Sequence, residues 1–537
     1  MGRVTRRAVL KAAAGAFALS ALPACGSRGR IGGRIVDDSA GRGHRLRDGV
    51  EGLRVASRED VPVVIAGGGV AGLSAAWKLA RSGEQGFLLL ELEDSVGGTA
   101  AGGESPVSRY PWGAHYVPVP TREQRTLCEL LFEGGVIRGF DGKGRAIPAE
   151  EHLCRAPEER LFFEGEWREG LYPREGASAD DLRQWDRFEA ETRAFGARRD
   201  ADGRRAFAIP TARSSRDPAL LALDGTSMAA WLSSRGYDSR RLLWTVEYAC
   251  RDDFGARLGG VSAWAGIHYY AARIAVPGDE AAPLLTWPEG NAFLVRLLAR
   301  SSAGRARTGA VVLAVEPSKD RVVVRWLDVA QGVLREAVAE HVVCALPRFA
   351  ARRAVRGLEG ERGGFETSPW AVANVTLSRT PRSRGFAPAW DNVLFDSESL
   401  GYVDATHQTD RAERDAVWTW YRPFPGADPA GDRARLLATP WESWRDQVLS
   451  DLAPAHDDFE GAVVSIDVRR WGHGMVRPEP GFLWGEARRK AALPLGRVHF
   501  AAADLGGLPL FEEAQWAGVR AAEEVLAARG KPFESSL

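Results

Sequence analysis

The first strong pattern of apolar positions is a short uniform run, Val63–Ala66, followed by an Ala- and Leu-rich stretch that ends near Leu79. A short apolar run without alternation is typical of a parallel strand buried on both faces, and the longer stretch is typical of a helix. A second apolar run, Phe87–Leu90, follows at the distance expected for a strand–helix–strand unit. The pattern therefore predicts an α/β fold that begins with a doubly wound parallel sheet.

Further strands are predicted in the second half of the chain. The runs Ala310–Val315, Arg321–Leu327 and Val333–Ala339 are separated by short polar turns, which is typical of an antiparallel β-meander. The run 341–346, closed by Pro347, predicts another buried strand. We therefore expect the meander to lead back into the parallel sheet.

The remaining regions have different patterns. Residues 120–285 alternate charged, helix-like segments such as Ala179–Ala197 with loops, and residues 370–485 mix strand-like and helical runs. Near the C-terminus, Val498–Ala502 predicts a last buried strand and Glu512–Arg529 a long helix. The two middle regions suit a second, α+β domain that interrupts the first.

Glycines follow the first strand at G-x-G-x-x-G spacing, at Gly67, Gly69 and Gly72. The first permits a tight turn, the second lets a pyrophosphate approach the backbone, and the third lets helix and strand pack closely. The helix N-terminus then faces the anion. Glu91 ends the second strand, nineteen residues after Gly72, where an acid can accept a ribose hydroxyl. Together these features predict a dinucleotide-binding site.

Composition excludes several classes of function. The 71 Lys and Arg residues equal the 71 Asp and Glu residues, so no overall field favours nucleic acid or an anionic membrane. No apolar span of 18 residues predicts a transmembrane helix. The cysteines have no C-x-x-C spacing, so we predict no metal site and no dithiol pair, and we expect Cys128, Cys154, Cys250 and Cys344 to be buried free thiols.

The N-terminus resembles an export signal. Thr5–Lys11 contains the pair Arg6-Arg7 and precedes the apolar stretch Ala12–Leu22, a layout similar to a twin-arginine export signal. Leu22–Cys25 looks like a bacterial lipobox with Cys25 as the lipidated residue, the alternative being ordinary cleavage with Cys25 as a bystander. We therefore expect export to the periplasm or cell envelope by the twin-arginine machinery, with a lipid anchor at Cys25. Residues 26–58, rich in Gly, Arg and Ser, predict a disordered linker.

Five ordered blocks resemble the FAD-dependent amine oxidase superfamily, which includes monoamine and polyamine oxidases, phytoene desaturases and protoporphyrinogen oxidase. The blocks are the glycine motif with Glu91, the double glycine 97–98, the segment Trp112–His115, the strand around Val312, and the C-terminal segment 500–522. The resemblance implies noncovalently bound FAD. The residues it implies for cofactor binding are Gly67, Gly68, Gly69, Ala71, Gly72, Glu91, Gly97, Gly98, Thr99, Gly113, Ala114, His115, Val312, Asp504, Glu513 and Ala514.

The resemblance also implies how the domains are interleaved. We expect a Rossmann-like FAD-binding domain, with its antiparallel meander, interleaved with an α+β substrate domain. The expected division is a signal over 1–25, a linker over 26–58, FAD-binding parts over 59–120, 286–350 and 491–530, and substrate-domain parts over 121–285 and 351–490.

Three departures from the family pattern bear on the chemistry. Thr99 stands where the family commonly has an arginine that meets the pyrophosphate, and Glu513-Ala514 replaces a Gly-Ala pair. In the strand Trp370–Leu377, Asn374 stands where the alignment places the lysine of amine oxidases. These changes weaken the case for amine oxidation more than the case for flavin binding.

Several side chains are candidates for the reaction. His115 is predicted to accept a proton or to polarise the flavin edge, and the alternative is a structural hydrogen bond. Asn374 is predicted to contact the flavin or the substrate, and the alternative is an ordinary residue of the strand. Trp471 and Phe511 are predicted to line the substrate pocket, and for Phe511 the alternative is core packing. The acid pairs Asp252-Asp253 and Asp457-Asp458 could attract a cationic amine, but we interpret both as solvated turns.

The sequence therefore predicts an exported FAD-dependent oxidoreductase that oxidises a C–N or C–C bond by hydride transfer to flavin. The expected partner is a small-molecule substrate, either an amine or an apolar molecule, and nucleic acid is not expected. Two alternatives stay open: a desaturase or isomerase of isoprenoids or lipids, and a flavin-binding envelope protein without turnover.

Overall fold

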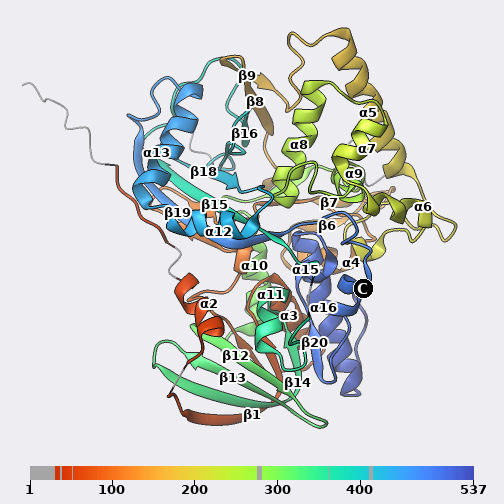
Figure 1. The fold of residues 1–537 in the computed structure, drawn as a ribbon, viewed down its shortest axis with the longest axis vertical. Helices are drawn as coiled ribbons and strands as arrows, with labels where there is room; N and C mark the ends of the chain where they lie inside the picture. Colours follow the sequence, from red (N-terminus) through yellow and green to blue (C-terminus); the bar gives the residue numbers. More distant parts are fainter. Residues whose placement is uncertain (1–30, 37–38, 51, 275–280, 362, 410–414) are drawn as a thin grey trace, which may run out of the picture.

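The computed structural model describes residues 31–36, 39–50, 52–274, 281–361, 363–409 and 415–537. These residues form two lobes, each built on a seven-stranded sheet. In Figure 1 the lower lobe carries the Rossmann-like sheet, and the upper lobe carries the other large sheet together with a helical part. They are called the Rossmann lobe and the second lobe below.

The Rossmann sheet is formed by β1 (Val55–Ala66), β2 (Phe87–Leu90), β11 (Ala306–Arg307), β12 (Ala310–Pro317), β13 (Val322–Asp328), β14 (Val333–Cys344) and β20 (Val498–Phe500). Its order is β11-β2-β1-β14-β13-β12, with β20 paired to β14. Because β1 pairs in parallel with β2 and β14, the predicted parallel core is confirmed. The predicted meander is confirmed as well, since β12, β13 and β14 pair antiparallel.

Strand β14 joins two runs that the sequence pattern had separated. One edge of β14 pairs with β1 from Leu334 to Cys344. The opposite edge pairs first with β13, up to Ala339, and then with β20, from Val342 onward. A single strand therefore attaches the meander to the parallel sheet, and the carboxyl ends of β1, β14 and β20 lie at one edge.

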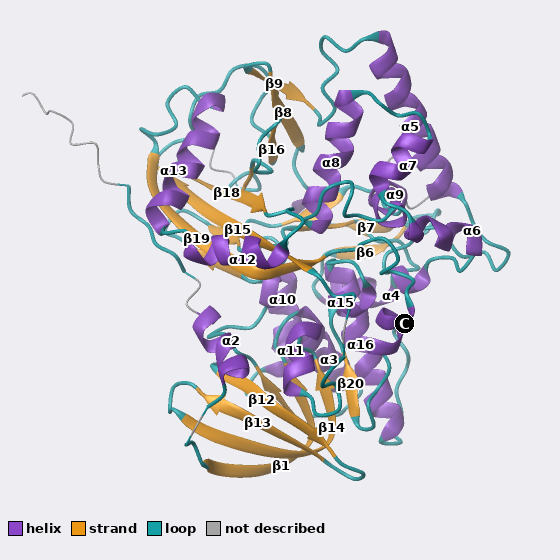
Figure 2. Ribbon diagram, viewed as in Figure 1, coloured by secondary structure: helices purple, strands orange, loops and turns teal. Residues whose placement is uncertain are grey.

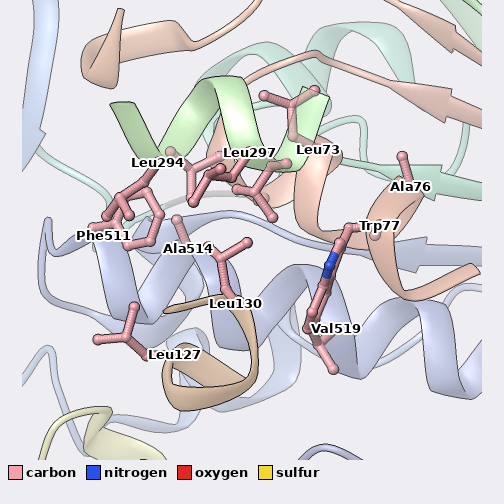
Figure 3. Packing of buried hydrophobic residues seen from close by; sticks show 14 of the residues in the cluster. Leu73, Ala76, Trp77, Leu127, Leu130, Leu294, Leu297, Phe511, Ala514 and Val519 are labelled. Carbon is pink, nitrogen blue, oxygen red and sulfur yellow. The ribbon is translucent and has the colours of Figure 1, made fainter. Parts of the chain in front are cut away.

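Four helices share one hydrophobic core beside this sheet: α3 (Val70–Arg81), α4 (Arg125–Glu133), α10 (Ala292–Ala299) and α16 (Phe511–Ala528). Figure 3 shows Leu73 of α3, Leu130 of α4, Leu297 of α10 and Val519 of α16 packing together. Helix α4 lies after residue 121, where we expected the substrate domain to begin. Helix α4 packs with the Rossmann lobe, because its apolar face contacts α16 and belongs to the same core as α3.

The second lobe has the strand order β19-β15-β18-β17-β16-β8-β9. Its strands are β8 (Glu159–Phe163), β9 (Glu166–Glu169), β15 (Thr367–Leu377), β16 (Asp391–Leu394), β17 (Tyr402–Asp404), β18 (Ala416–Pro423) and β19 (Val463–Val476). Its helices are α5 (Ala179–Ala197), α6 (Pro218–Leu221), α7 (Met228–Ser234), α8 (Arg240–Phe254), α9 (Ala263–Ala271), α12 (Pro429–Ala438) and α13 (Trp441–Leu452). In Figure 2, α12 and α13 lie against the sheet, and α5, α6, α7 and α9 form a group to its right. The expected helical segment is confirmed in α5, whose start is fixed by a capping box between Ser178 and Asp181.

Short elements complete the chain. They are α2 (Ser39–Asp48), β3 (Gly102–Glu104), β4 (Arg109–Pro111), β5 (Tyr116–Pro118), β6 (Ile137–Phe140), β7 (Ala146–Pro148), β10 (Leu284–Thr286), α11 (Arg348–Ala354), α14 (Glu486–Ala491) and α15 (Ala503–Gly506). Within the described chain no helix is long and apolar enough to cross a membrane. The four expected thiols are free and buried, as predicted.

The segment before β1 differs from the disordered linker that its composition predicted. Gly32 and Val36 donate backbone hydrogen bonds to Val464 and Val468, so this part of the chain runs beside the edge of β19. Helix α2 follows and packs against β12 and α11. The predicted signal, including Arg6-Arg7 and Cys25, lies outside the described residues.

Candidate functional site

A cavity of about 1250 Å³ is lined by residues of both lobes. Its walls come from the glycine-rich turn after β1, the end of β2, β12, α11, β15, β19 and the start of α16, with α2 along one side. Thirteen of the predicted cofactor-binding residues line it: Gly67, Gly69, Ala71, Glu91, Gly97, Gly98, Thr99, Gly113, Ala114, His115, Val312, Asp504 and Ala514. The sequence blocks that the family resemblance assigns to one cofactor site therefore line one cavity.

The glycine motif has the geometry that its spacing predicted. Gly67 has φ +106°, and a Cβ on Gly72 would lie 1.8 Å from the Gly67 carbonyl oxygen, so only glycine allows this contact of helix and turn. At Gly69, by contrast, a Cβ would meet only the Cα of Gly98, at 3.9 Å. Gly69 thus leaves an open cradle on the cavity wall at the N-terminus of α3, where backbone N–H groups favour an anion.

Glu91 stands at the end of β2, as expected. Its carboxylate accepts hydrogen bonds from the backbone N–H of Gly68 at 2.7 Å and of Glu93 at 2.8 Å. Burial raises the pKa of Glu91 to about 7. Gly68 itself, a predicted contact, is not among the lining residues, and its N–H donates to Glu91.

The double glycine and the segment around Gly113 meet across the turn. Gly97 donates a 2.9 Å hydrogen bond to the Gly68 carbonyl, and Ala114 donates one of 3.1 Å to the carbonyl of Thr99. A Cβ on Gly113 would lie 2.2 Å from that Thr99 oxygen. Three sequence blocks that are far apart are thus held together by backbone contacts.

The C-terminal block brings an acid and a helix start to the cavity. Asp504 accepts a 2.6 Å hydrogen bond from the Arg348 backbone through Oδ2, while its Oδ1 is buried and has no partner in the described chain. Burial raises the pKa of Asp504 to about 6. Ala514 lines the cavity, but the Glu513 side chain points elsewhere, because its carboxylate accepts hydrogen bonds from the Thr211 backbone and hydroxyl. Glu513, which was predicted to bind the cofactor, is not a lining residue of the cavity.

Asn374 also differs from its predicted role. It is buried within the sheet, donates to the Pro111 carbonyl at 3.1 Å and accepts from the Thr419 hydroxyl at 2.7 Å. It is not a lining residue of the cavity; Trp370 and Val372 of the same strand are. Asn374 therefore fixes β4 to the second lobe, and an apolar valine faces the cavity instead.

His115 lies among aromatic rings. Its imidazole centroid is 5.0 Å from that of Tyr421 and 5.4 Å from that of Trp390, and its Nδ1 lies 3.3 Å from the carbonyl oxygen of Gly113. Because a carbonyl only accepts hydrogen bonds, Nδ1 carries the proton and Nε2 a lone pair. Burial lowers the pKa of His115 to about 4, so the ring is neutral at neutral pH.

Trp471 and Phe511 line the cavity where they were expected. The indole N–H of Trp471 donates a 2.6 Å hydrogen bond to the carbonyl of Trp112, which ties β19 to the segment before His115. Phe511 begins α16 and belongs to the core of the Rossmann lobe on its other side. Both residues thus line the cavity and also pack against a hydrophobic core.

Acidic groups gather at one end of the cavity. Asp252 and Asp253 of α8 line it together with Glu512, so the interpretation of this acid pair as a solvated turn was wrong. Asp253 forms a 3.0 Å ion pair with Arg273, which also donates to the Tyr116 hydroxyl at 2.9 Å. Burial raises the pKa of Glu512 to about 7, and burial with the adjacent charge of Asp253 raises that of Asp252.

The second acid pair is on the surface, as interpreted. Asp457 pairs with Arg384 at 3.1 Å, and Asp458 pairs with Arg379 at 2.6 Å and accepts from the Arg382 backbone. Neither acid lines the cavity.

Charge therefore divides the cavity into two ends. Arginines line it near α2, α11, α12 and β19, together with the acids Glu91, Glu93 and Glu361. At the α8 end, Asp252, Asp253 and Glu512 line it with Arg273. Asp252-Asp253 was considered as an amine-binding pair from the sequence, but its meeting with Glu512 was not predicted, because more than 250 residues separate them. The basic arginines are Arg47, Arg352, Arg353, Arg433, Arg469 and Arg470.

Comparisons with known proteins agree with this architecture. Residues 65–131 match the family described as NAD(P)-binding Rossmann-like domain. No curated protein matches the chain. The structure is similar to that of putrescine oxidase bound to putrescine, with a TM-score of 0.64 and 16% identity over 88% of this chain and 100% of that one.

Two further solved structures are similar. Cyclohexylamine oxidase from Brevibacterium oxydans IH-35A gives a TM-score of 0.59 at 17% identity, covering 87% of this chain and 99% of that one. A CLA-producing fatty acid isomerase from P. acnes gives 0.58 at 15% identity, covering 87% and 98%. The likeness shows the fold. The chain has a Rossmann-like dinucleotide-binding domain and a second domain in the two-domain arrangement of these proteins.

Proposed function

We propose that this protein is an FAD-dependent oxidoreductase that oxidises a cationic amine at its C–N bond. The observation that carries the proposal is the acidic end of the cavity, where Asp252 and Glu512 lie near the aromatic wall around His115. An anionic dinucleotide suits the basic end and a cationic substrate suits the acidic end. The similar fold of two amine oxidases supports amine oxidation as the proposed reaction.

The residues of the cavity fit FAD. The open cradle at Gly69 and the carboxylate of Glu91 suit its ADP half, and the unpartnered Oδ1 of Asp504 would accept a hydroxyl of its ribityl chain. The segment Gly113–His115 and the N-terminus of α16 would border its ring. When bound, the flavin supplies a two-electron acceptor for hydride from the substrate carbon.

The chain's own residues would prepare the substrate for that step. An ammonium group must lose a proton before its carbon can give up a hydride, and the lone pair on Nε2 of His115 would accept it. The carboxylates of Asp252 and Glu512 would hold a cationic group of the substrate. Trp370, Val372 and Trp471 line the wall with apolar surface that excludes water.

A second candidate is the desaturation or isomerisation of an apolar molecule. Val372 in place of a polar residue on β15 favours it, and a fatty acid isomerase has a similar fold. An apolar substrate would leave the acids Asp252 and Glu512 without a ligand. We therefore prefer the amine.

Anaerobic mixing tests the proposal. The flavin of the purified protein should lose its colour with diamines or monoamines and keep it with isoprenoids and fatty acids. Asp252→Asn should weaken amine binding about 10- to 100-fold, the range for a hydrogen bond to a charged group. Asp457→Asn, on the surface, is the matched control and should bind as the wild type does.

Other outcomes of this screen identify the alternatives. Loss of colour with an apolar substrate, unaffected by Asp252→Asn, would select the second candidate. Retained flavin that no substrate reduces would select a flavin-binding protein without turnover.

We also propose export by the twin-arginine route to the periplasm or cell envelope, with a lipid on Cys25. The support is the sequence around Arg6-Arg7 and Cys25. Replacing Arg6 and Arg7 by lysine should trap the precursor inside the cell, whereas Arg3→Lys should not. Normal export of the double variant would remove the assignment, and Cys25→Ser tests the lipid by loss of membrane association.

A further inference from the structure

The glycine-rich part of the Rossmann lobe lacks a cation for a diphosphate. Between Gly67 and Ala100 the cavity is lined by the carboxylates of Glu91 and Glu93 and by no lysine or arginine. The N-terminus of α3 contributes only a partial positive charge of about one half. A dinucleotide that carries two phosphate charges therefore needs a cation from another part of the chain.

Arg469 reaches this place from the second lobe. It lies on β19, and its guanidinium packs over the ring of Trp471 at 4.2 Å. One Nη forms a 2.9 Å ion pair with Glu93 of the Rossmann lobe. The side chain is 12% exposed, and its Nε is buried without a partner in the described chain. A buried N–H donor of this kind is costly unless a ligand accepts from it.

The neighbours of Arg469 place it between the two ends of the cavity. Trp471 donates to Trp112, next to the segment where the flavin ring would lie. Glu93 follows Glu91, where the adenosine ribose would lie, by two residues. The diphosphate of a dinucleotide joins these two groups, so it would pass the free side of the guanidinium.

Other arginines at this end are less suited. The side chain of Arg47 is 52% exposed and pairs with Asp48, and Arg352 is bound by Glu361 and the Gly363 carbonyl. Arg353 is exposed. Arg469 lines the cavity, is more buried than Arg47, and has an Nε without a partner in the described chain.

We propose that Arg469 binds the diphosphate of the dinucleotide, so that the second lobe completes the cofactor site of the Rossmann lobe. This inference rests on the dinucleotide binding that the proposed function requires. It assigns to Arg469 the counter-charge that Thr99 does not supply. Cofactor binding would then hold the two lobes together through one side chain.

The experiment measures FAD affinity for the full chain after its flavin has been removed. The dissociation constant is obtained from flavin fluorescence for the wild type and for Arg469→Gln, Arg469→Lys and Arg422→Gln. Arg422 is the matched control: it lies on β18 of the same sheet, pairs with Glu398 and donates to Gln447, and does not line the cavity. Thermal melting without FAD reports whether each variant folds.

Arg469→Gln should weaken FAD binding about 10- to 100-fold. Arg469→Lys should lose less, because it keeps the charge but not the planar fork. Arg422→Gln should stay within twofold of the wild type. If Arg469→Gln also binds within twofold, or if Arg422→Gln loses as much, the inference is wrong while the proposed function stands. A wild-type chain that binds no FAD overturns the proposed function itself.

Discussion

The hydroxyl of Tyr421 donates a 3.0 Å hydrogen bond to the carbonyl oxygen of Gly113, the same oxygen that lies 3.3 Å from Nδ1 of His115. One backbone oxygen thus orients both rings. Because Nδ1 donates to it, Nε2 keeps its lone pair. With a pKa lowered to about 4, the imidazole is a weak base that would hold the substrate proton only transiently.

His115→Gln should therefore slow flavin reduction by substrate about 100-fold or more, the usual contribution of a general base. Tyr421→Phe, which removes one of the two contacts to Gly113 but leaves the imidazole, should have a smaller effect. Anaerobic stopped-flow measurement of flavin reduction checks both. A rate for His115→Gln within threefold of the wild type would assign His115 a purely structural hydrogen bond.

Substrate affinity should depend on pH through the acidic end of the cavity. Burial raises the pKa of Glu512 to about 7 and also raises that of Asp252, so both acids are largely neutral at pH 6 and charged at pH 8. A cationic amine should therefore bind more tightly as pH rises across this range. The dissociation constant measured between pH 6 and pH 8 should fall for the wild type.

Asp252→Asn should flatten that dependence, and Asp457→Asn should leave it unchanged. A dissociation constant that does not vary with pH, or one that varies equally in both variants, would separate amine binding from these acids.

The parts of the site that follow directly from strand ends could be predicted from the sequence. The glycine motif, Glu91 and Asp504 each lie next to a short buried strand, so their position at the edge of the sheet follows from the strand pattern. Asn374 could not be placed in this way. Nearly every residue of β15 is buried, on both faces, so no alternation of apolar and polar positions marks which residue faces the cavity.

Features that depend on contacts between residues far apart in the sequence could not be predicted. Arg469 meets Glu93 across 376 positions of the chain, and neither neighbourhood has a motif. Helix α2 has a composition typical of disorder, yet it packs against β12 and α11, and Arg42 forms a bidentate ion pair with Asp94. Tertiary contacts, which local patterns do not contain, decide both cases.

Two glycines of the motif allow binding and folding to be separated. A valine at Gly69 finds open space, so Gly69→Val should fold with the melting temperature of the flavin-free wild type yet retain no FAD. Gly72→Ala should be destabilised by about 1–3 kcal/mol or more, because its Cβ meets a backbone oxygen that cannot move freely. Flavin content and thermal melting measure the two effects. Full flavin content in Gly69→Val would contradict the placement of the diphosphate.

A pair of histidines away from the cavity, His341 and His499, should make the stability of the protein depend on pH. Nη1 of Arg497 lies 3.1 Å from Nε2 of His341, whose Nδ1 lies 3.2 Å from Nε2 of His499, and Nδ1 of His499 lies 2.9 Å from Glu524. Because arginine only donates, every hydrogen in this chain of bonds points toward Glu524, and His341 must be neutral. Burial, together with the positive charges of Arg497 and Arg529, lowers the pKa of His341 to about 4.

The folded-state pKa of His341 thus lies below its ordinary value of about 6.5, so the unfolded chain binds the proton more readily. This contribution to stability is fully present above pH 6.5 and is lost as the pH falls from there toward 4. His341→Gln can still accept from Arg497 and donate to His499 but does not titrate. Its free energy of unfolding should therefore depend less on pH between 7 and 5 than that of the wild type or of His407→Gln. Equal slopes in denaturant titrations of all three proteins would show that His341 does not supply the pH dependence.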